Sequence, residues 1–266
     1  MRVAVAQFAS GADSAANRAR ALDLLRTAAQ DGAELVVLPE AAMYCLDRPA
    51  GEIARAAEGL DGPFVTALAQ AASTLGVTAV AGMFEAVPGE DRVHNTVVAV
   101  GAGGLLGRYR KLHLYDALGF KESDVLLPGR IDGDELLVLP LGEVVVGVVT
   151  CYDLRFPEVF RALADRGVTA FAVPAAWVAG PLKEEHWMTM CRARAIENTS
   201  YLLAAAQPPP TYCGRSVVLD PMGVQLAGLG ERDGTASADV LPARVDAVRA
   251  ALPVLTQRRY EVRPRA

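Results

Sequence analysis

The sequence predicts an α/β fold in which β-sheets pack face to face and helices cover their outer faces. Two observations carry this prediction. Short apolar runs of strand length alternate with segments whose apolar residues recur at helical spacing, which is typical of α/β folds. Several neighbouring strands are joined by short turns rather than by helices, which favours hairpins over a purely doubly wound sheet.

The first half of the chain begins with a strand and a helix that has Leu22, Leu25 and Ala29 on one face. Glycines at 101, 103 and 104 predict a hairpin turn, because their spacing does not match a dinucleotide-binding motif and a strand follows them. The expected strands are 2–8, 34–38, 77–84, 96–100, 106–114, 135–139 and 144–150, and the expected helices are 15–30 and 64–75.

The second half repeats the strand–helix pattern. A helix at 155–166 carries Pro157 and Glu158 in its first turn, as helix starts prefer. Asp220-Pro221-Met222-Gly223 is a good turn sequence between two strands. The other expected elements are strands 169–173, 201–206, 215–219, 224–227 and 235–239, and helices 182–197 and 242–251.

No repeat, low-complexity tract or Pro/Ser-rich linker divides the 266 residues. We therefore expect a single domain over 1–266, with a C-terminal tail from about 252. The last residues, LTQRRYEVRPRA, are basic and irregular. They are either a solvated arm or a contact with another subunit.

Composition excludes several functional classes. The chain has 26 Lys and Arg against 31 Asp and Glu, for a net charge of −5, so it lacks the basic surface typical of nucleic-acid or anionic-membrane binding. Apolar runs are interrupted by Pro, Gly and Glu before they reach the length of a membrane span, and no secretory leader is recognisable. We expect a cytoplasmic protein that binds neither nucleic acid nor membrane.

The four cysteines and three histidines are too scattered to suggest a C-x-x-C pair or an H-E-x-x-H motif. This distribution predicts free thiols, no metal site and no cofactor.

Three reactive side chains occur where predicted strands end or turn: Glu40, Lys111 and Cys151. Ligand sites in open α/β sheets lie at the carboxyl ends of strands. A thiol at a strand-to-helix turn lies near partial positive charge that favours the thiolate, which is how we interpret Cys151. Partial desolvation would raise the pKa of Glu40 and suit it to general-base work, although a solvated loop residue is the alternative. Lys111 is ambiguous by itself.

The segments LPEAAMY, YRKLHLYD, KESDVLLPG, CYDLRFPE and RARAIENTSY occur in this order. Together they resemble the nitrilase superfamily of carbon–nitrogen hydrolases, and most closely its branch of omega-amidases and deaminated-glutathione amidases. The resemblance runs from the first strand to about residue 260. It implies a four-layer α-β-β-α sandwich and homo-oligomers, dimeric or larger, that pair through helices such as 155–166 and 182–197.

By the same resemblance, Glu40, Lys111 and Cys151 form a Glu–Lys–Cys triad, and Glu122 is a second glutamate that holds the lysine. Cys151 would attack an amide carbon to form a thioester, with Glu40 transferring protons. Lys111 and the backbone N–H of Tyr152 would stabilise the oxyanion.

The remaining assignments concern the substrate and the partner helix. The resemblance places Tyr44, Tyr152 and Trp177 at the substrate, although core packing is the alternative for Trp177. Arg192, Arg194 and Glu197 are expected to form an ion-paired helix face or a subunit contact.

An amidase acting on a small linear amide is the leading functional hypothesis. A nitrilase or an N-carbamoyl amino acid hydrolase would use the same residues and stays open. An acyl-transfer enzyme and a non-catalytic binding protein are less favoured alternatives. The acyl group of the substrate is not predicted, because no arginine can be assigned to a substrate carboxylate.

Overall fold

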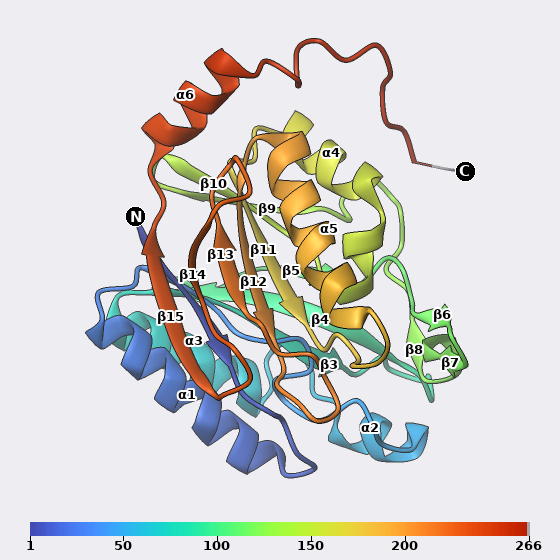
Figure 1. Ribbon diagram of the computed structural model, residues 1–266. Coiled ribbons are helices and arrows are strands. Elements are labelled where there is room, and N and C mark those ends of the chain that lie inside the picture. The colour runs from blue at the N-terminus through green and yellow to red at the C-terminus, as the bar shows by residue number, and fades with distance from the viewer. Residues whose placement is uncertain (265–266) are drawn as a thin grey trace.

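The computed structural model describes residues 1–264, whose main elements form four layers (Figure 1). Two sheets lie face to face, with α1 and α3 against the first and α4 and α5 against the second. This is the predicted α-β-β-α sandwich. The longer helices are α1 (Ser14–Gln30), α3 (Pro63–Leu75), α4 (Pro157–Asp165), α5 (Lys183–Asn198) and α6 (Pro242–Ala251).

The first sheet mixes parallel and antiparallel pairs, because β1 pairs parallel with β2 and antiparallel with the late strand β15. Its order is β15 (Gly234–Asp239), β1 (Arg2–Gln7), β2 (Leu35–Val37), β3 (Thr78–Glu85), β4 (Val93–Gly101) and β5 (Gly104–Arg110), with β8 (Leu126–Leu127) beside β4.

The second sheet is also mixed. Its order is β14 (Gln225–Gly228), β13 (Val217–Leu219), β12 (Tyr201–Ala206), β11 (Ala170–Ala175), β10 (Val144–Val148) and β9 (Leu137–Leu141). The predicted hairpin turn at the glycines is confirmed, since β4 and β5 pair antiparallel around it.

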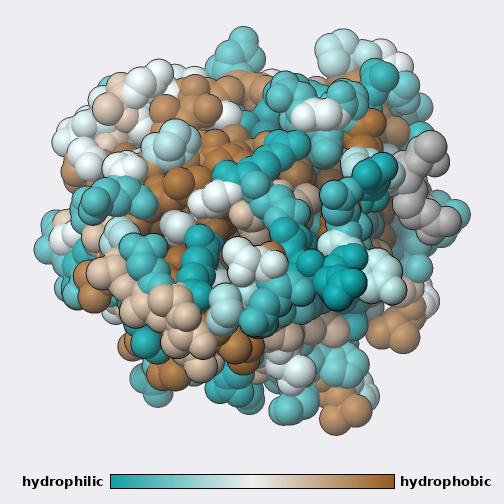
Figure 2. Space-filling model, turned by 90° about the horizontal axis from the view of Figure 1, so that it is seen from above, coloured by the Kyte–Doolittle hydropathy of each residue, from teal (hydrophilic) through white to brown (hydrophobic). Residues whose placement is uncertain are grey.

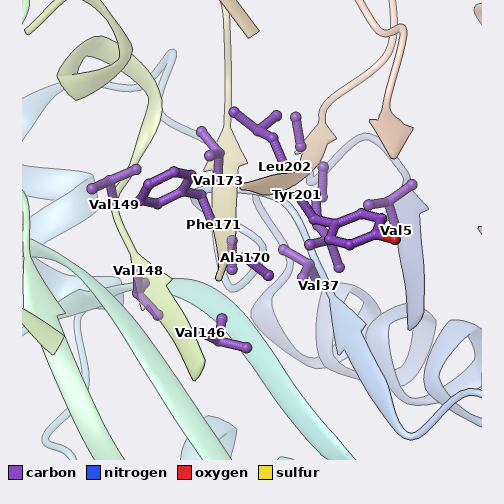
Figure 3. Close-up of a cluster of buried hydrophobic side chains, with 14 of the residues drawn as sticks. Val5, Val37, Val146, Val148, Val149, Ala170, Phe171, Val173, Tyr201 and Leu202 are labelled. Atoms are coloured by element: carbon purple, nitrogen blue, oxygen red, sulfur yellow. The ribbon is translucent and has the colours of Figure 1, made fainter. Parts of the chain in front are cut away.

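Strand alternation divides the core into two parts. In β1, Val3 and Val5 face the second sheet, whereas Ala4 and Ala6 face the helices α1 and α3. Figure 3 shows Val5 in the inter-sheet cluster with β-branched residues of β2 and β10. The burial of apolar side chains on both faces explains why the central strands are apolar almost throughout.

Several predicted elements have bounds that differ from expectation, and two of these differences lie next to the site. The helix predicted at 155–166 is wrong at its start: a 3₁₀-helix η2 (Cys151–Arg155) comes first, and α4 begins at Pro157. Proline disfavours helical backbone at the preceding residue, and Phe156 is accordingly extended. The strand predicted at 106–114 ends earlier, because β5 stops at Arg110 and frees the following segment from the sheet.

Several short elements are absent from the sequence prediction. They are α2 (Ala50–Ala56), β6 (Asp116–Ala117), β7 (Phe120–Lys121), η1 (Glu122–Asp124) and the short strand β8. Such short pieces carry too few residues for a periodic pattern.

Part of the C-terminal tail contacts its own chain, since Arg258 pairs with Asp165 at the end of α4. Among residues 1–264, none of the helices combines the length and the apolar run needed to cross a membrane.

Candidate active site

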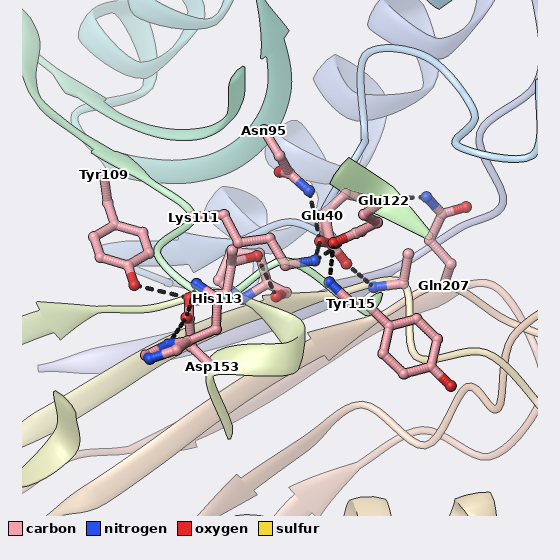
Figure 4. Close-up of polar contacts among 12 residues, drawn as sticks. Glu40, Asn95, Tyr109, Lys111, His113, Tyr115, Glu122, Asp153 and Gln207 are labelled. Atoms are coloured by element: carbon pink, nitrogen blue, oxygen red, sulfur yellow. Dashed lines mark hydrogen bonds and ion pairs between the residues drawn. The ribbon is translucent and has the colours of Figure 1, made fainter. Parts of the chain in front are cut away.

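The four reactive residues singled out in the sequence come together although they are far apart in the chain. Figure 4 shows three of them, Glu40, Lys111 and Glu122. Glu40 follows β2, and Lys111 is the first residue after β5. Glu122 begins η1, and Cys151 begins η2 shortly after β10. Loops at strand ends from both sheets therefore build one site, as expected for α/β folds.

Glu40 is fully buried and accepts three hydrogen bonds at its carboxylate. Oε1 accepts from Lys111 Nζ at 3.0 Å and from Asn95 Nδ2 at 2.7 Å. Oε2 accepts from the backbone N–H of Ala176 at 2.6 Å, at the end of β11 in the second sheet. The carboxylate is thus held by both sheets at once, which leaves it little freedom to move.

The backbone of Glu40 is held equally closely. Gly82 in β3 lies directly beneath it, and a Cβ at this position would approach the Cα of Glu40 and the N of Ala41 to 2.6 Å. Gln207 Nε2 also donates to the carbonyl of Glu40 at 2.9 Å. Only glycine leaves room for this approach.

Lys111 Nζ lies between two carboxylates, at 3.0 Å from Glu40 Oε1 and 2.9 Å from Glu122 Oε1. Glu122 is fixed in turn, because its Oε2 accepts from the backbone N–H of Tyr115 at 2.7 Å. Burial opposes the charge of Lys111, but Glu122 and Glu40 outweigh burial and raise the pKa of Lys111 well above its ordinary value. The lysine is therefore a permanent cation.

The pKa values of the two glutamates are shifted in opposite directions. Burial alone would raise the pKa of Glu40, but the charge of Lys111 and hydrogen bonds from Cys151 and Lys111 outweigh it, so the pKa of Glu40 is lowered. Burial raises the pKa of Glu122, with a smaller contribution from Glu40, against the attraction of Lys111. The expectation that desolvation raises the pKa of Glu40 is therefore wrong, because the neighbouring cation decides its sign.

Cys151 is buried and has a positive φ of 44°, a strained backbone for a residue with a side chain. Burial and the nearby Glu40 carboxylate raise the pKa of the Cys151 thiol well above its ordinary value, despite Lys111. The expected thiolate is therefore wrong for this resting state. A protonated thiol beside an ionised carboxylate is instead arranged for proton transfer at the moment of attack.

Asp153 was missed in the sequence, although it also lies in the buried polar layer (Figure 4). Its carboxylate accepts from Tyr109 Oη at 2.7 Å and contacts His113 Nδ1 at 2.7 Å. It also accepts from the backbone N–H of Thr150 at 3.3 Å, which closes a capping box at the start of η2. The Thr-x-x-Asp spacing around Cys151 is a signal that could have revealed it. Asn95, inside an apolar strand, offers no such signal.

A hollow of about 330 Å³, partly open to solvent, lies at these groups. Its walls include Leu46, Lys111, Tyr115, Phe120, Glu122, Cys151, Tyr152, Ala176, Trp177, Val178 and Lys183. The hollow is small, and part of this volume is open to solvent, which suits a small molecule.

Of the three predicted substrate contacts, two line the hollow and one does not. Tyr152 and Trp177 line the hollow, and the Trp177 indole donates to the carbonyl of Lys183 at 3.0 Å. Tyr44 is buried in the cluster between the first sheet and its helices, with Oη 3.4 Å from Glu52. It does not line this hollow.

In α5, the expected ion pair forms between Arg194 and Glu197 at 2.9 Å, but Arg194 is buried and also donates to the carbonyl of Leu154, whereas Arg192 is exposed. Over the part of the chain that the structure describes, no group of His, Cys, Asp and Glu could hold a metal ion.

The family model described as carbon–nitrogen hydrolase matches residues 2–250, almost the whole chain. The chain belongs to the carbon–nitrogen hydrolase family. It is a hydrolase of non-peptide carbon–nitrogen bonds, and a member of the nitrilase superfamily that the sequence motifs resemble.

Individual relatives of this hydrolase match over nearly their full lengths. It is 40% identical to a deaminated glutathione amidase of Escherichia coli O157:H7, over 98% of each chain. It is 31% identical to an omega-amidase of Xenopus tropicalis, over 98% of this chain and 96% of the relative. A double mutant of the amidase from Nesterenkonia sp. AN1, solved in complex with acrylamide, superposes with a TM-score of 0.82 at 26% identity, over 97% of this chain and 94% of that one.

Proposed function

We propose that this hydrolase is an amidase that releases ammonia and a carboxylic acid from a small linear amide through a thioester at Cys151. The observation that carries the proposal is the buried Lys111 ammonium, held between Glu40 and Glu122 beside a buried thiol in a small hollow. Relatives named as amidases, and an amidase structure holding the small amide acrylamide, support the same chemistry.

The first half of the reaction forms the thioester. Glu40 takes the proton of the Cys151 thiol, and the sulfur attacks the amide carbon. The negative charge that develops on the amide oxygen is stabilised by Lys111 and the backbone N–H of Tyr152. When the carbon–nitrogen bond breaks, the nitrogen takes the proton from Glu40 and leaves as ammonia.

The second half releases the acid. A water molecule gives a proton to Glu40 and adds to the thioester carbon, and the sulfur leaves and recovers the proton. Lys111 keeps its charge throughout, because both neighbouring carboxylates hold its pKa far above neutrality. Glu122 keeps the lysine in position, and its raised pKa suits it to assist proton transfer.

Ammonia release from the purified protein tests this function. The panel contains α-ketoglutaramate, glutaramate and aliphatic amides, together with nitriles and N-carbamoyl amino acids; deaminated glutathione is assayed beside it by the cysteinylglycine that its hydrolysis would release, since it holds no primary amide. We expect release from amides by the wild type and none by Cys151→Ala. Turnover of nitriles or N-carbamoyl amino acids without amides would contradict the amidase assignment and favour the alternatives that share these residues.

The domain organisation, the location in the cell and the oligomeric state of the protein are also proposed. We take the chain as one domain with a tail from about 252, acting in the cytoplasm, where its four free cysteines stay reduced. We propose a homo-oligomer, because exposed apolar side chains such as Met222, Val224 and Leu241 remain on its surface, and Figure 2 shows hydrophobic areas between hydrophilic ones. Light scattering at defined protein concentration tests the oligomer, and a monomer would contradict it.

A further inference from the structure

Asn95 is a buried polar side chain in an otherwise apolar part of β4. Val97 and Ala99 of this strand belong to the cluster between the two sheets, and strand alternation places Asn95 on the same face. Its exposed fraction is 0%. Burying an amide costs free energy unless its hydrogen bonds are made, so this position calls for an explanation.

Only half of this amide is satisfied. Asn95 Nδ2 donates to Glu40 Oε1 at 2.7 Å (Figure 4), whereas Asn95 Oδ1 is buried and has no hydrogen-bond donor among residues 1–264. The reverse orientation would set an oxygen against the ionised carboxylate of Glu40, so the amide acts there as a donor. The unpaired Oδ1 makes Asn95 a costly way to fill this space, which indicates that its donor serves the site.

Asn95 is bound to Lys111 as well, through its main chain. Thr96 and Arg110 form the terminal pair at this end of the β4–β5 ladder. The N–H of Lys111 extends the ladder by donating to the carbonyl of Asn95 at 2.9 Å. One residue therefore holds the backbone of the lysine and the carboxylate of Glu40 in a fixed relation.

The two oxygens of the Glu40 carboxylate are occupied unequally. Each carboxylate oxygen can accept about two hydrogen bonds. Oε1 accepts from Lys111 Nζ and from Asn95 Nδ2, so it is filled. Oε2 accepts from the backbone N–H of Ala176, which leaves it one lone pair. The hydrogen bond from the Cys151 thiol to Glu40 therefore has its place at Oε2.

We propose that Asn95 is a positioning residue that, together with Lys111, fills Oε1 of Glu40 and so makes Oε2 the oxygen that exchanges protons. The proton of Cys151 Sγ passes to Oε2 as the sulfur attacks, and Oε2 gives it to the departing nitrogen. Without Asn95, Oε1 has a free lone pair and competes for the proton. The inference rests on the proposed amidase function, and Asn95 acts in it through Glu40.

Asn95→Leu tests the inference, because leucine has a similar size and donates no hydrogen bond. The acidic limb of the pH–rate profile should move up by about one to two pH units, which is the worth of a hydrogen bond to a charged group. At the plateau we expect kcat to fall about tenfold because the base is less well placed, with KM within about twofold. Asn95→Asp keeps the shape but puts a second carboxylate against Glu40, so its limb should move further.

The groups that could titrate near Glu40 all stay in place in Asn95→Leu. They are Lys111 after β5, Glu122 in η1, Cys151 in η2 and Tyr212 after β12. A moved limb in this variant therefore reports the lost hydrogen-bond donor rather than a lost charge.

Asn198→Leu is the matched control. Asn198 is equally buried, donates from Nδ2 to the carbonyl of Arg194 at 2.9 Å and also has an unpaired Oδ1. Its amide is bonded within α5 rather than to Glu40, so the acidic limb should stay where it lies in the wild type. An unmoved limb in Asn95→Leu, or equal shifts in both variants, would overturn the inference.

Alkylation of Cys151 by iodoacetamide separates this inference from the function itself. The sulfur displaces iodide and the thiol proton passes to Glu40, so the reaction needs the same proton transfer without an amide. Mass spectrometry of the Cys151 peptide follows the rate against pH in the wild type and in Asn95→Leu. An acidic limb that moves in Asn95→Leu, without ammonia release by the wild type from any amide, would support the inference and refute the amidase. Amide turnover with unmoved limbs would refute the inference alone.

Discussion

Glu40 and Asp153 are two fully buried carboxylates that follow the ends of β2 and β10, in opposite sheets. Glu40 is bonded to a lysine and lies beside the Cys151 thiol. Asp153 is bonded to Tyr109, to His113 and to the backbone of Thr150, and no reactive side chain lies among these partners.

The two carboxylates therefore serve different purposes. The hydrogen bonds of Asp153 join β5, the segment after Lys111 and the turn before Cys151. The role of Asp153 is therefore structural, because it holds these three segments together. The bonds of Glu40 fix its position and keep it ionised next to a proton that it can accept. Burial of a carboxylate is not itself a sign of catalysis, because the groups that it contacts decide its role.

The largest expected difference is in turnover. Glu40→Gln keeps the size of the side chain but removes the base, and we expect kcat/KM to fall at least about 10³-fold. Asp153→Asn, its matched counterpart, should lose less than about tenfold, because it contacts no reacting atom. Amide hydrolysis by both variants, with folding checked by circular dichroism, measures the contrast. Equal losses would remove the distinction between the two carboxylates.

The next largest effect concerns the cation. Lys111→Met should lower kcat/KM by about 10²–10³, as for a lost oxyanion donor. The acidic limb of the pH–rate profile should also move to higher pH, because Lys111 lowers the pKa of Glu40 and an unassisted buried carboxylate takes up its proton sooner. In the wild type this limb should lie below the ordinary glutamate range of about 4.3.

Lys121→Met is the control for that variant, since Lys121 is exposed and pairs with Asp124 at 2.8 Å. It should leave both rate and profile unchanged. An unshifted acidic limb in Lys111→Met would argue against Glu40 as the titrating base.

A smaller effect should follow from displacing Glu40 without changing it. Gly82→Ala places a methyl group against the backbone of Glu40 and Ala41. We expect a loss of about 1–3 kcal/mol of unfolding free energy from overpacking, and up to about 10²-fold in kcat/KM from misplacement. Urea unfolding and kinetics measure both. Gly103→Ala, with room around its Cβ, should change neither. Normal activity in Gly82→Ala would show that the contact does not position the base.

The smallest expected effect comes from weakening the hydrogen bonds of Asp153. Tyr109→Phe removes one of the hydrogen bonds to Asp153 and should cost about 1 kcal/mol of unfolding free energy, with turnover within about twofold. Urea unfolding beside steady-state kinetics checks it. A collapse of turnover at unchanged stability would instead assign Asp153 a direct part in the reaction.

Much of this protein could be predicted from particular sequence patterns. The apolar runs of β1, β2 and β10 were recognisable because side chains buried on both faces of a strand leave a nearly continuous hydrophobic signal. The motifs around residues 40, 111, 122 and 151 pointed to a family, and the family model matches 2–250. The start of α4 was misplaced because Pro157 also fits a later first turn.

The sequence by itself determined the layers, the family and the types of reactive side chain, since these depend on periodicity and local motifs. Only the tertiary structure decided their states. The pKa of the Cys151 thiol is raised by burial and by the nearby Glu40, and the pKa of Glu40 is lowered because Lys111, from a distant segment, outweighs burial. The contacts of the Lys183 ammonium with the rings of Tyr115 and Trp177 likewise form only when α5 packs against them. Electrostatic energies depend on the distances between charges and on their burial, and neither can be read from the amino-acid sequence.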